Sequence, residues 1–334
     1  VLIEDGHIVP WDIVLGTDSH TCTNGAMGAL AFGVGTTDGA YAMATGHIYD
    51  FVVPETFQFE LIGDFSKGVY AKDLILHIIG TVGAGGCSRR VAEFVGDGVR
   101  RMPMDGRTTV CNMAVEMSAR TGIMPTDETL LGYLKDRAQW PVEPVASDPD
   151  AMFANRMSVD LSTLEPMVAF PHKPANAVPF SRIPEMMAKS QAQPGPDLPP
   201  VTSDRITDGF VGACTNGRYD DLVEVAKVLR GNKVHTDVSL VVIPASRKVY
   251  ERAMDEGILQ VIVKAGANVE SSNCGPCFGS HMGVLSKNAQ MISSSNRNYQ
   301  GRMGSRDARI FLGSPATVAA SAIEGRLADP RKYL

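Results

Sequence analysis

The fold expected for this chain is decided by residues 209–218, Gly-Phe-Val-Gly-Ala-Cys-Thr-Asn-Gly-Arg. The first four residues form the apolar run of a short buried strand, and polar residues follow at its carboxyl end. Parallel α/β sheets place their chemistry at this end of a strand. We therefore expect Cys214, which lies just after the strand, to belong to a functional site.

Strands and helices alternate along the chain after this stretch. The hydrophobic pattern predicts helices over 220–229 and 247–256 and strands over 238–243 and 261–263. Such alternation is typical of parallel α/β units, because each helix returns the chain to the start of the next strand. Residues 205–334 are therefore predicted to form one parallel α/β domain.

The part of the chain before residue 205 has the same mixed character. In order, it is predicted to contain a buried strand over 12–15, closely packed helices over 25–46, a strand over 55–62, a helix over 71–79, a helical segment over 111–121 and a helix over 128–137. Residues 187–204 are rich in proline and favour an extended backbone that packs poorly, so we interpret them as a linker.

The composition is that of a globular protein with more than one domain. The chain has 334 residues, of which 44% are hydrophobic and 20% charged. Its formal net charge of -6 provides no basic surface for nucleic acid and no polybasic membrane anchor. Without a long apolar run or a secretory leader, we expect a cytoplasmic protein whose six cysteines are thiols or metal ligands.

Three of these cysteines have the spacing of a metal site. Cys274-Gly-Pro-Cys277 can grip one metal centre from a single turn, and Cys214 adds a third thiolate from a strand end. Three ligands leave one coordination position open, as in a cubane iron-sulfur cluster with one reactive iron. The spacing alone leaves two other interpretations open, a structural zinc site with His281 as fourth ligand and a redox Cys-x-x-Cys pair.

Two further motifs carry polar chemistry. The loop over 293–302 contains Arg297 and Arg302, whose guanidinium groups suit the carboxylates of a small organic acid. In Asp18-Ser19-His20, the Asp and His residues can form an orienting pair for proton transfer. Taken singly, the first motif is also compatible with a solvated surface loop and the second with a structural role.

Together, these motifs resemble the aconitase superfamily over residues 12–329, and in particular the large-subunit lineage of 3-isopropylmalate dehydratase and homoaconitase. The matching segments are Asp18-Ser19-His20, Glu93-Phe94, Cys111-Asn112-Met113 with Glu116, Cys214, Cys274 to Cys277, and Asn296-Arg297 with Arg302. The segments 53–56 and 67–73 favour the two-subunit lineage over mitochondrial-type aconitase.

The resemblance implies a cofactor and a set of site residues. It implies a [4Fe-4S] cluster held by Cys214, Cys274 and Cys277. The catalytic residues would be Asp18, Ser19, His20 and Glu93, and the substrate-binding residues would be Asn296, Arg297 and Arg302. The implied reaction is the isomerisation of a substituted malate by dehydration and rehydration, with 3-isopropylmalate of leucine biosynthesis as the expected substrate.

The resemblance also implies an architecture and a partner. The implied fold is a three-domain α/β/α iron-sulfur fold in which most of the first domain is absent from this chain. Residues 1–54 would be the remainder of domain 1, 55–186 domain 2, 187–204 the proline-rich linker and 205–334 domain 3. In this lineage the swivelling domain, with its base serine, is a separate small subunit, which would be the partner of this chain.

Two alternatives stay open at this point. Homoaconitase and other alkylmalate or methylmalate dehydratases share the same motifs and differ in substrate. A metal-binding or RNA-binding scaffold with an aconitase-like fold would be no enzyme at all, but the acidic net charge disfavours RNA because phosphate binding needs a basic surface.

Overall fold

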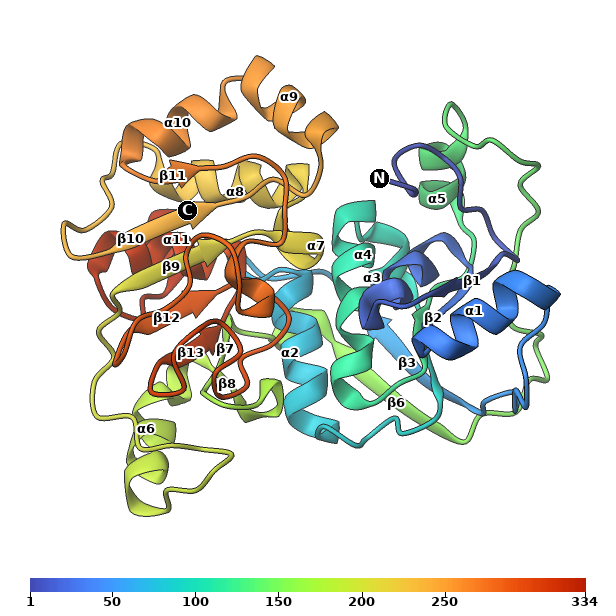
Figure 1. The fold of residues 1–334 in the computed structure, drawn as a ribbon, viewed down its shortest axis with the longest axis horizontal. Helices are drawn as coiled ribbons and strands as arrows, with labels where there is room; N and C mark the ends of the chain where they lie inside the picture. Colours follow the sequence, from blue (N-terminus) through green and yellow to red (C-terminus); the bar gives the residue numbers. More distant parts are fainter. The chain divides into compact units, whose positions relative to one another are not determined.

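The computed structural model describes every residue from Val1 to Leu334 and divides into two compact units (Figure 1). Unit 1 comprises Val1–Asp64 and Val82–Ser162, and unit 2 comprises Phe65–Thr81 and Thr163–Leu334. Both units combine parallel strands with helices, which confirms the predicted α/β class. None of the helices has the length and apolar character that crossing a membrane requires.

The first part of unit 1 is a two-stranded parallel sheet of β1 (Ile13–Gly16) and β2 (Leu30–Gly33). A 3-10 helix, Ser19–Met27, connects the two strands. It begins where the side chain of Asp18 accepts a hydrogen bond from the His20 N–H group, and it ends at Gly28 in the left-handed conformation. Helix α1 (Thr36–Thr45) follows β2.

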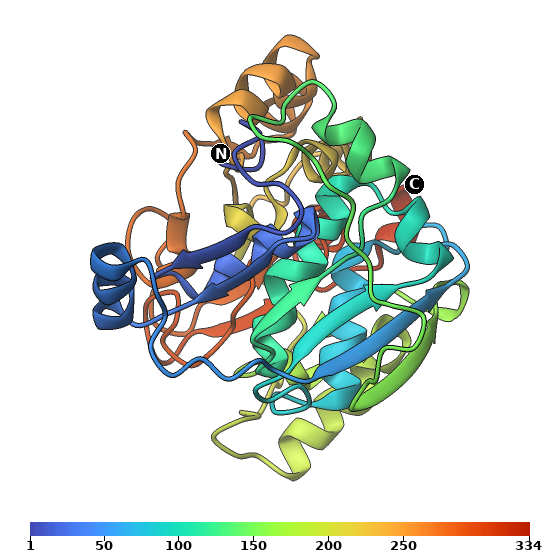
Figure 2. The same cartoon turned by 90° about the vertical axis from the view of Figure 1, so that its right-hand side faces the viewer.

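The second part of unit 1 is a four-stranded parallel sheet, in the order β5-β4-β3-β6, and Figure 2 shows its strands side by side. The strands are β3 (Thr56–Ile62), β4 (Val91–Val95), β5 (Thr121–Ile123) and β6 (Asn155–Asp160). The helices are α3 (Asp97–Arg101), α4 (Met104–Met113) and α5 (Glu128–Leu134). Stacked rings of Phe57, Phe59 and Phe94 contribute to the core beneath this sheet.

Unit 2 is built on a seven-stranded sheet in the order β11-β10-β9-β12-β13-β7-β8. The strands are β7 (Met167–Ala169), β8 (Ala177–Pro179), β9 (Asp208–Val211), β10 (Ser239–Val242), β11 (Asn268–Val269), β12 (Gln290–Ser293) and β13 (Arg309–Leu312). The five strands from β11 to β13 are parallel, and β7 and β8 join antiparallel at one side.

The helices of unit 2 cover this sheet and bury an aliphatic core. They are α2 (Ala71–Val82, in this unit as far as Thr81), α6 (Ile183–Ala192), α7 (Ala213–Asn216), α8 (Tyr219–Leu229), α9 (Arg247–Asp255), α10 (Ile258–Ala265) and α11 (Pro315–Glu324). The 3-10 helices of the chain, besides the one over 19–27, are Ala114–Met117, Leu161–Thr163, Pro174–Asn176, Phe180–Arg182, Gly275–Phe278 and Pro330–Tyr333. Helices α9 and α10 lie together beyond the β11 edge of the sheet (Figure 1).

The strand predicted over 261–263 is wrong, because these residues lie in helix α10. Three consecutive β-branched residues suggest a strand, but the side chains that the core buries are Leu259, Ile262 and Ala265, which have helical spacing. Left-handed glycines at positions 257 and 266 bound the helix at either end. The other strands and helices predicted after residue 208 are confirmed, with bounds shifted by one or two residues.

Three predictions in the first two thirds of the chain need correction. The linker over 187–204 begins with six residues of α6, and buried Ser190 holds the following segment by accepting from the Val201 N–H group. The helix over 111–121 is the end of α4 followed by a 3-10 turn that stops at Ser118 in the left-handed conformation. Residues 25–46 include β2, and no side chain of α1 is buried.

The close packing expected of the Gly- and Ala-rich segment is present at Gly25. A Cβ atom at this position would lie 1.7 Å from the Gly122 carbonyl oxygen, so only glycine fits. This contact brings the 3-10 helix over 19–27 against β5, and the same helix packs on α4. Residues 1–54 thus belong to one compact unit with 82–162, so the units cut across the predicted domain boundaries, which remain a prediction.

Candidate active site

In unit 1, the site residues gather around His20. The His20 ring is buried and its Nε2 donates to Glu116 Oε1 at 3.0 Å, while Nδ1 lies 3.4 Å from Ser19 Oγ. Asp18 Oδ1 accepts from the His20 backbone N–H at 2.7 Å and lies 3.7 Å from Nδ1. With Nε2 as the donor, the neutral ring keeps Nδ1 as an acceptor on the Ser19 side.

Glu116 is absent from the site residues predicted from sequence, although its segment matches a family motif. It follows α4, and its carboxylate is almost completely buried. The end of α4 is tied to the 3-10 helix of His20 by two hydrogen bonds, from Asn112 Nδ2 to Thr23 Oγ1 at 2.8 Å and from Cys22 Sγ to the Asn112 carbonyl at 3.3 Å. In the sequence, Asn112 and Glu116 are four residues apart, a spacing that places two side chains on the same face of a helix and so could have indicated that Glu116 lies near His20.

Glu93 has different neighbours. It lies on β4, where its buried carboxylate accepts from Gln58 Nε2 at 3.0 Å and from Ser147 Oγ at 2.6 Å. Its hydrogen bonds therefore go to residues of β3 and of the loop before β6. The carboxylate that meets the ring of His20 is that of Glu116.

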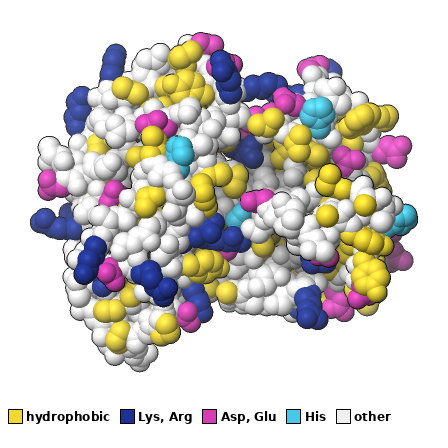
Figure 3. Space-filling model, in the orientation of Figure 1, with side chains coloured by type: hydrophobic (Ala, Val, Ile, Leu, Met, Phe, Trp, Pro, Cys, Tyr) yellow, Lys and Arg dark blue, Asp and Glu magenta, His cyan; other side chains and the backbone are white.

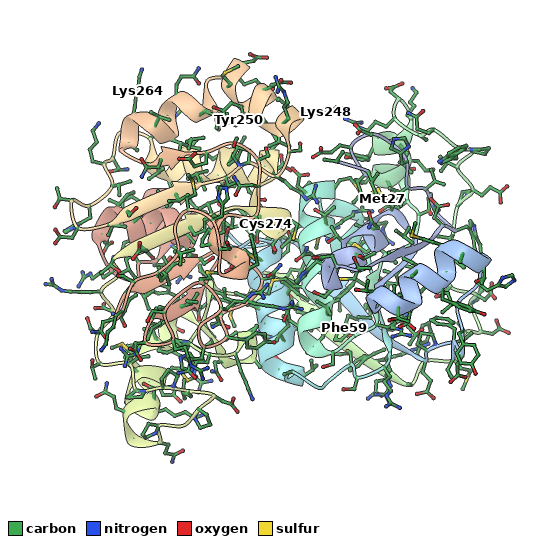
Figure 4. All side chains as sticks on the ribbon, in the orientation of Figure 1. Met27, Phe59, Lys248, Tyr250, Lys264 and Cys274 are labelled. Carbon is green, nitrogen blue, oxygen red and sulfur yellow. The ribbon has the colours of Figure 1, made fainter.

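In unit 2, the three predicted cluster cysteines lie at the carboxyl side of the parallel strands. Cys214 is in α7, directly after β9. Cys274 precedes the 3-10 turn over Gly275–Phe278 that follows β11, and Cys277 lies within this turn; Figure 4 labels Cys274. Cys214 and Cys274 are exposed, whereas Cys277 is buried. Gly275 permits the tight turn, since it has a φ of +53° and a Cβ there would meet Ile243 at 2.7 Å.

The three thiols and Arg302 are within electrostatic reach of one another. Burial raises the pKa of the Cys277 thiol to about 11, and the nearby Cys214 and Cys274 act in the same direction. The guanidinium of Arg302, which also forms a hydrogen bond to this thiol, opposes the rise in pKa. Cys277 therefore lies among two thiols and one cation.

Asn296 connects the cysteines to the loop over 293–302 that carries Arg297 and Arg302, here called the arginine loop. Its Nδ2 lies 3.8 Å from Cys214 Sγ and its Oδ1 lies 3.5 Å from Cys277 Sγ, so the amide contacts both thiols. Two residues later, Asn298 Nδ2 donates to the carbonyls of Phe170 and Ile310 and fixes the loop to the sheet. The structure thus brings together residues that the sequence assigns separately to metal and to substrate. Arg297, next to Asn296, is half-buried.

This fold and these motifs define a class of protein. Residues 1–325 match the model of the Aconitase family (aconitate hydratase), and the chain belongs to this family.

The relatives indicate a particular branch of the family. The chain is 48% identical over 334 residues to 3-isopropylmalate dehydratase large subunit 1 of Methanopyrus kandleri, a match that covers all of this chain and 75% of that protein. It is 43% identical over 335 residues to the 3-isopropylmalate dehydratase large subunit of Desulfitobacterium hafniense, again with 100% and 75% coverage. These relatives are dehydratases, that is, hydro-lyases. Among solved structures, aconitase X of Thermococcus kodakaraensis in its holo-form matches with a TM-score of 0.47 and 13% identity, over 89% of this chain and 66% of that one.

Proposed function

We propose that this chain is the large subunit of a hydro-lyase that isomerises a substituted malate, with 3-isopropylmalate as the substrate that its relatives favour. The observation that carries the proposal is the position of Asn296. Its amide contacts the thiols of Cys214 and Cys277 from the same loop that bears Arg297 and Arg302. A metal centre on these thiols would therefore lie beside groups that bind carboxylates.

The donor set fits an iron-sulfur cluster. Cys214, Cys274 and Cys277 supply three thiols, the ligand type that iron-sulfur clusters use. A single tetrahedral zinc ion, with bonds of about 2.3 Å to sulfur, would need its ligands to converge on one point. No three His, Cys, Asp or Glu side chains in the chain are arranged to hold one ion, and His281, the possible fourth zinc ligand, is exposed. With His281 exposed, the donor set is the three thiols, and three thiols fit an iron-sulfur cluster.

When bound, the cluster would supply a Lewis acid for the hydroxyl and a carboxylate of the substrate. Arg297 and Arg302 would bind the carboxylates through their planar guanidinium groups. In its doubly protonated form, His20 would give the Nδ1 proton to the departing hydroxyl, which leaves the neutral ring, and would take a proton back from water during rehydration. The carboxylate of Glu116 at Nε2 would stabilise the charged form. The proton-relay role of Glu93 stays a prediction, and the hydrogen bonds of its carboxylate go to Gln58 and Ser147.

The relatives also suggest the context of the reaction. Their names describe large subunits, so we propose a small subunit as partner and leucine biosynthesis as the pathway. All six cysteines are thiols, which suits the reducing cytoplasm. On the face seen in Figure 3, Lys and Arg side chains are interspersed with Asp and Glu, which favours an enzyme of small acids over an RNA-binding scaffold. Homoaconitase remains the second candidate because its lineage shares these motifs and differs in substrate.

Anaerobic reconstitution with iron and sulfide tests the cluster. We expect about four irons and four sulfides per chain with broad visible absorbance. Changing Cys214, Cys274 or Cys277 to Ser should abolish this absorbance. The matched controls Cys22→Ser and Cys111→Ser, at buried cysteines of unit 1, should retain it. One zinc per chain without sulfide would disprove the proposed cofactor.

A further inference from the structure

Lys72 is a lysine without any exposed surface. It lies in the first turn of α2, and its Nζ donates to the carbonyl oxygens of Ser294 at 2.7 Å and Ser295 at 2.6 Å. Lysine is almost never fully buried unless its ammonium group is paired, because removing the charge from water is unfavourable. A buried ammonium bound to two adjacent carbonyls therefore points to a specific task at this place in the chain.

The two carbonyls belong to the residues directly before Asn296 and Arg297. The hydroxyl of Ser294 also bonds to the segment of Cys214, accepting from the Gly212 N–H at 3.2 Å and donating to the Asn216 carbonyl at 3.4 Å. The serine segment thus connects Lys72 on one side with α7 on the other. Whatever fixes this segment also fixes the start of the arginine loop relative to Cys214.

Helix α2 is a rigid support for Lys72. The neighbouring Asp73 accepts from the backbone N–H groups of Tyr70 at 2.9 Å and Met167 at 2.7 Å, which ties the start of the helix to β7. The following turns bury Leu74, Ile75, Ile78 and Ile79. An ammonium held on such a helix has little freedom to follow a moving loop.

We propose that Lys72 is a positioning residue that holds the Ser294 and Ser295 carbonyls so that Asn296 stays between the thiols of Cys214 and Cys277. The expected effect of Lys72 on turnover rests on the proposed function, whereas its expected effect on the reactivity of the thiols does not. Without the ammonium, two buried carbonyls lose their donor and the segment shifts to find new partners. Asn296 then leaves the thiols, and Cys277 loses its cover.

The test measures the alkylation rate of each cysteine by mass spectrometry, in the full chain without cluster, under native conditions with iodoacetamide. Lys72→Met removes the donors at similar length, and we expect the labelling of buried Cys277 to become at least tenfold faster. Lys72→Arg, which keeps charge and donors, should restore slow labelling to within about threefold. Cys22 and Cys111, fully buried in unit 1, report any global unfolding and should stay protected.

Two further variants distinguish the loss of the Lys72 contacts from a general destabilisation of α2. Ile78→Ala destabilises the same helix but keeps the Lys72 ammonium and its two acceptors, so Cys277 labelling should stay near the wild-type rate. Ser294→Ala removes the hydroxyl bonds to α7 and should accelerate labelling even if Lys72→Met does not fold. Unchanged Cys277 labelling in Lys72→Met would overturn the inference. If Lys72→Met does not fold, unchanged labelling in Ser294→Ala would do the same. Labelling that Ile78→Ala accelerates as much as Lys72→Met would also overturn it.

A second readout separates this inference from the proposed function. With a cognate small subunit and a full cluster, Lys72→Met should raise KM for 3-isopropylmalate at least tenfold, with rescue by Lys72→Arg. If the wild-type complex does not act on this substrate, the proposed function fails while the labelling result still decides the role of Lys72. If Cys277 becomes reactive but KM and kcat are unchanged, the positioning of the arginine loop is disproved.

Discussion

His20 is flanked by two carboxylates in different surroundings. The Glu116 side chain is 1% exposed and meets Nε2, whereas the Asp18 side chain is 79% exposed and mainly caps the 3-10 helix through the His20 N–H group. An interaction between charged groups is stronger where water is excluded. Glu116 should therefore be the stronger partner of the imidazole ring, whereas Asp18 fixes the start of the 3-10 helix that carries His20.

Glutamine substitutions test this assignment. Glu116→Gln keeps the shape but loses the charge, so we expect kcat in the assembled enzyme to fall by about a hundredfold or more, the usual scale for lost acid-base catalysis. Glu93→Gln is the matched control and should lose less than about tenfold, because its hydrogen bonds go to Gln58 and Ser147. Iron content is measured in both. The assignment fails if the Glu93 variant is the more impaired of the two.

Asp73 should make the stability of the chain depend on pH. Burial raises the pKa of this carboxyl from 3.8 to about 7, against the opposing effects of its backbone hydrogen bonds and the charge of Lys72. Between these two values the folded chain binds a proton that the unfolded chain has lost. The contribution of this protonated carboxyl to the free energy of unfolding is therefore fully present below about pH 4. It is lost as pH rises to about 7, and the total loss is about 4 kcal/mol.

Urea unfolding from pH 4.5 to 7.5 measures this slope. Asp73→Asn carries no titrating proton, so its free energy of unfolding should fall less with rising pH than that of the wild type. Asp255→Asn, at an exposed position of α9, is the control and should keep the wild-type slope. Parallel curves for Asp73→Asn and the wild type would contradict the raised pKa.

At the level of elements, α10 shows that the spacing of the buried side chains, and not the β-branched run, determines the secondary structure. Its core face is Leu259, Ile262 and Ala265, while Val263 is 54% exposed. Val263→Ala should stabilise the chain by up to about 0.7 kcal/mol, since alanine is the better helix former. Ile262→Ala should destabilise it by about 2–5 kcal/mol through loss of core packing. Urea unfolding checks both values, and a clear loss in Val263→Ala would indicate strand-like packing.

The same helix explains what the sequence could and could not predict. Elements whose apolar residues have one clear period, such as α8 and β3, were predicted to within one residue. In α10, the β-branched run 261–263 outweighed a longer helical pattern. The site shows a similar limit: Cys214, Cys274 and Cys277 are recognisable from local spacing, whereas the pairing of His20 with Glu116 spans 96 positions and depends on tertiary packing.

On the scale of the whole chain, each unit holds its own group of candidate site residues. Unit 1 holds His20 with Glu116, and unit 2 holds the three cysteines and the arginine loop. Unit 2 also takes residues 65–81, and with them Lys72, from the middle of the sequence of unit 1. Neither unit is thus a continuous segment, so a cut at residue 163 would remove Lys72 from the serines it binds.

We expect the large and small subunits to contribute different catalytic groups. In the proposed mechanism, the chain would supply thiols for a Lewis acid, guanidinium groups for carboxylates and an imidazole for the hydroxyl, and none of its residues is assigned as the base for the carbon-bound proton. The resemblance implies that this base would be a serine of a separate small subunit, and loss of a catalytic base lowers rates by orders of magnitude. The chain alone, even with a full cluster, should therefore not turn over 3-isopropylmalate or homoaconitate.

Exchanging the small subunit tests which subunit carries the catalytic base and which one determines the substrate preference. A full-length large subunit is assayed alone, with its cognate small subunit, and with a small subunit from a homoaconitase. We expect turnover only in the complexes, and a substrate preference that follows the small subunit, because the carboxylate-binding arginines proposed for this chain would serve the malate part that both substrates share. Robust turnover by the large subunit alone would mean that the base lies in this subunit. A preference that ignores the swap would likewise mean that the large subunit selects the substrate.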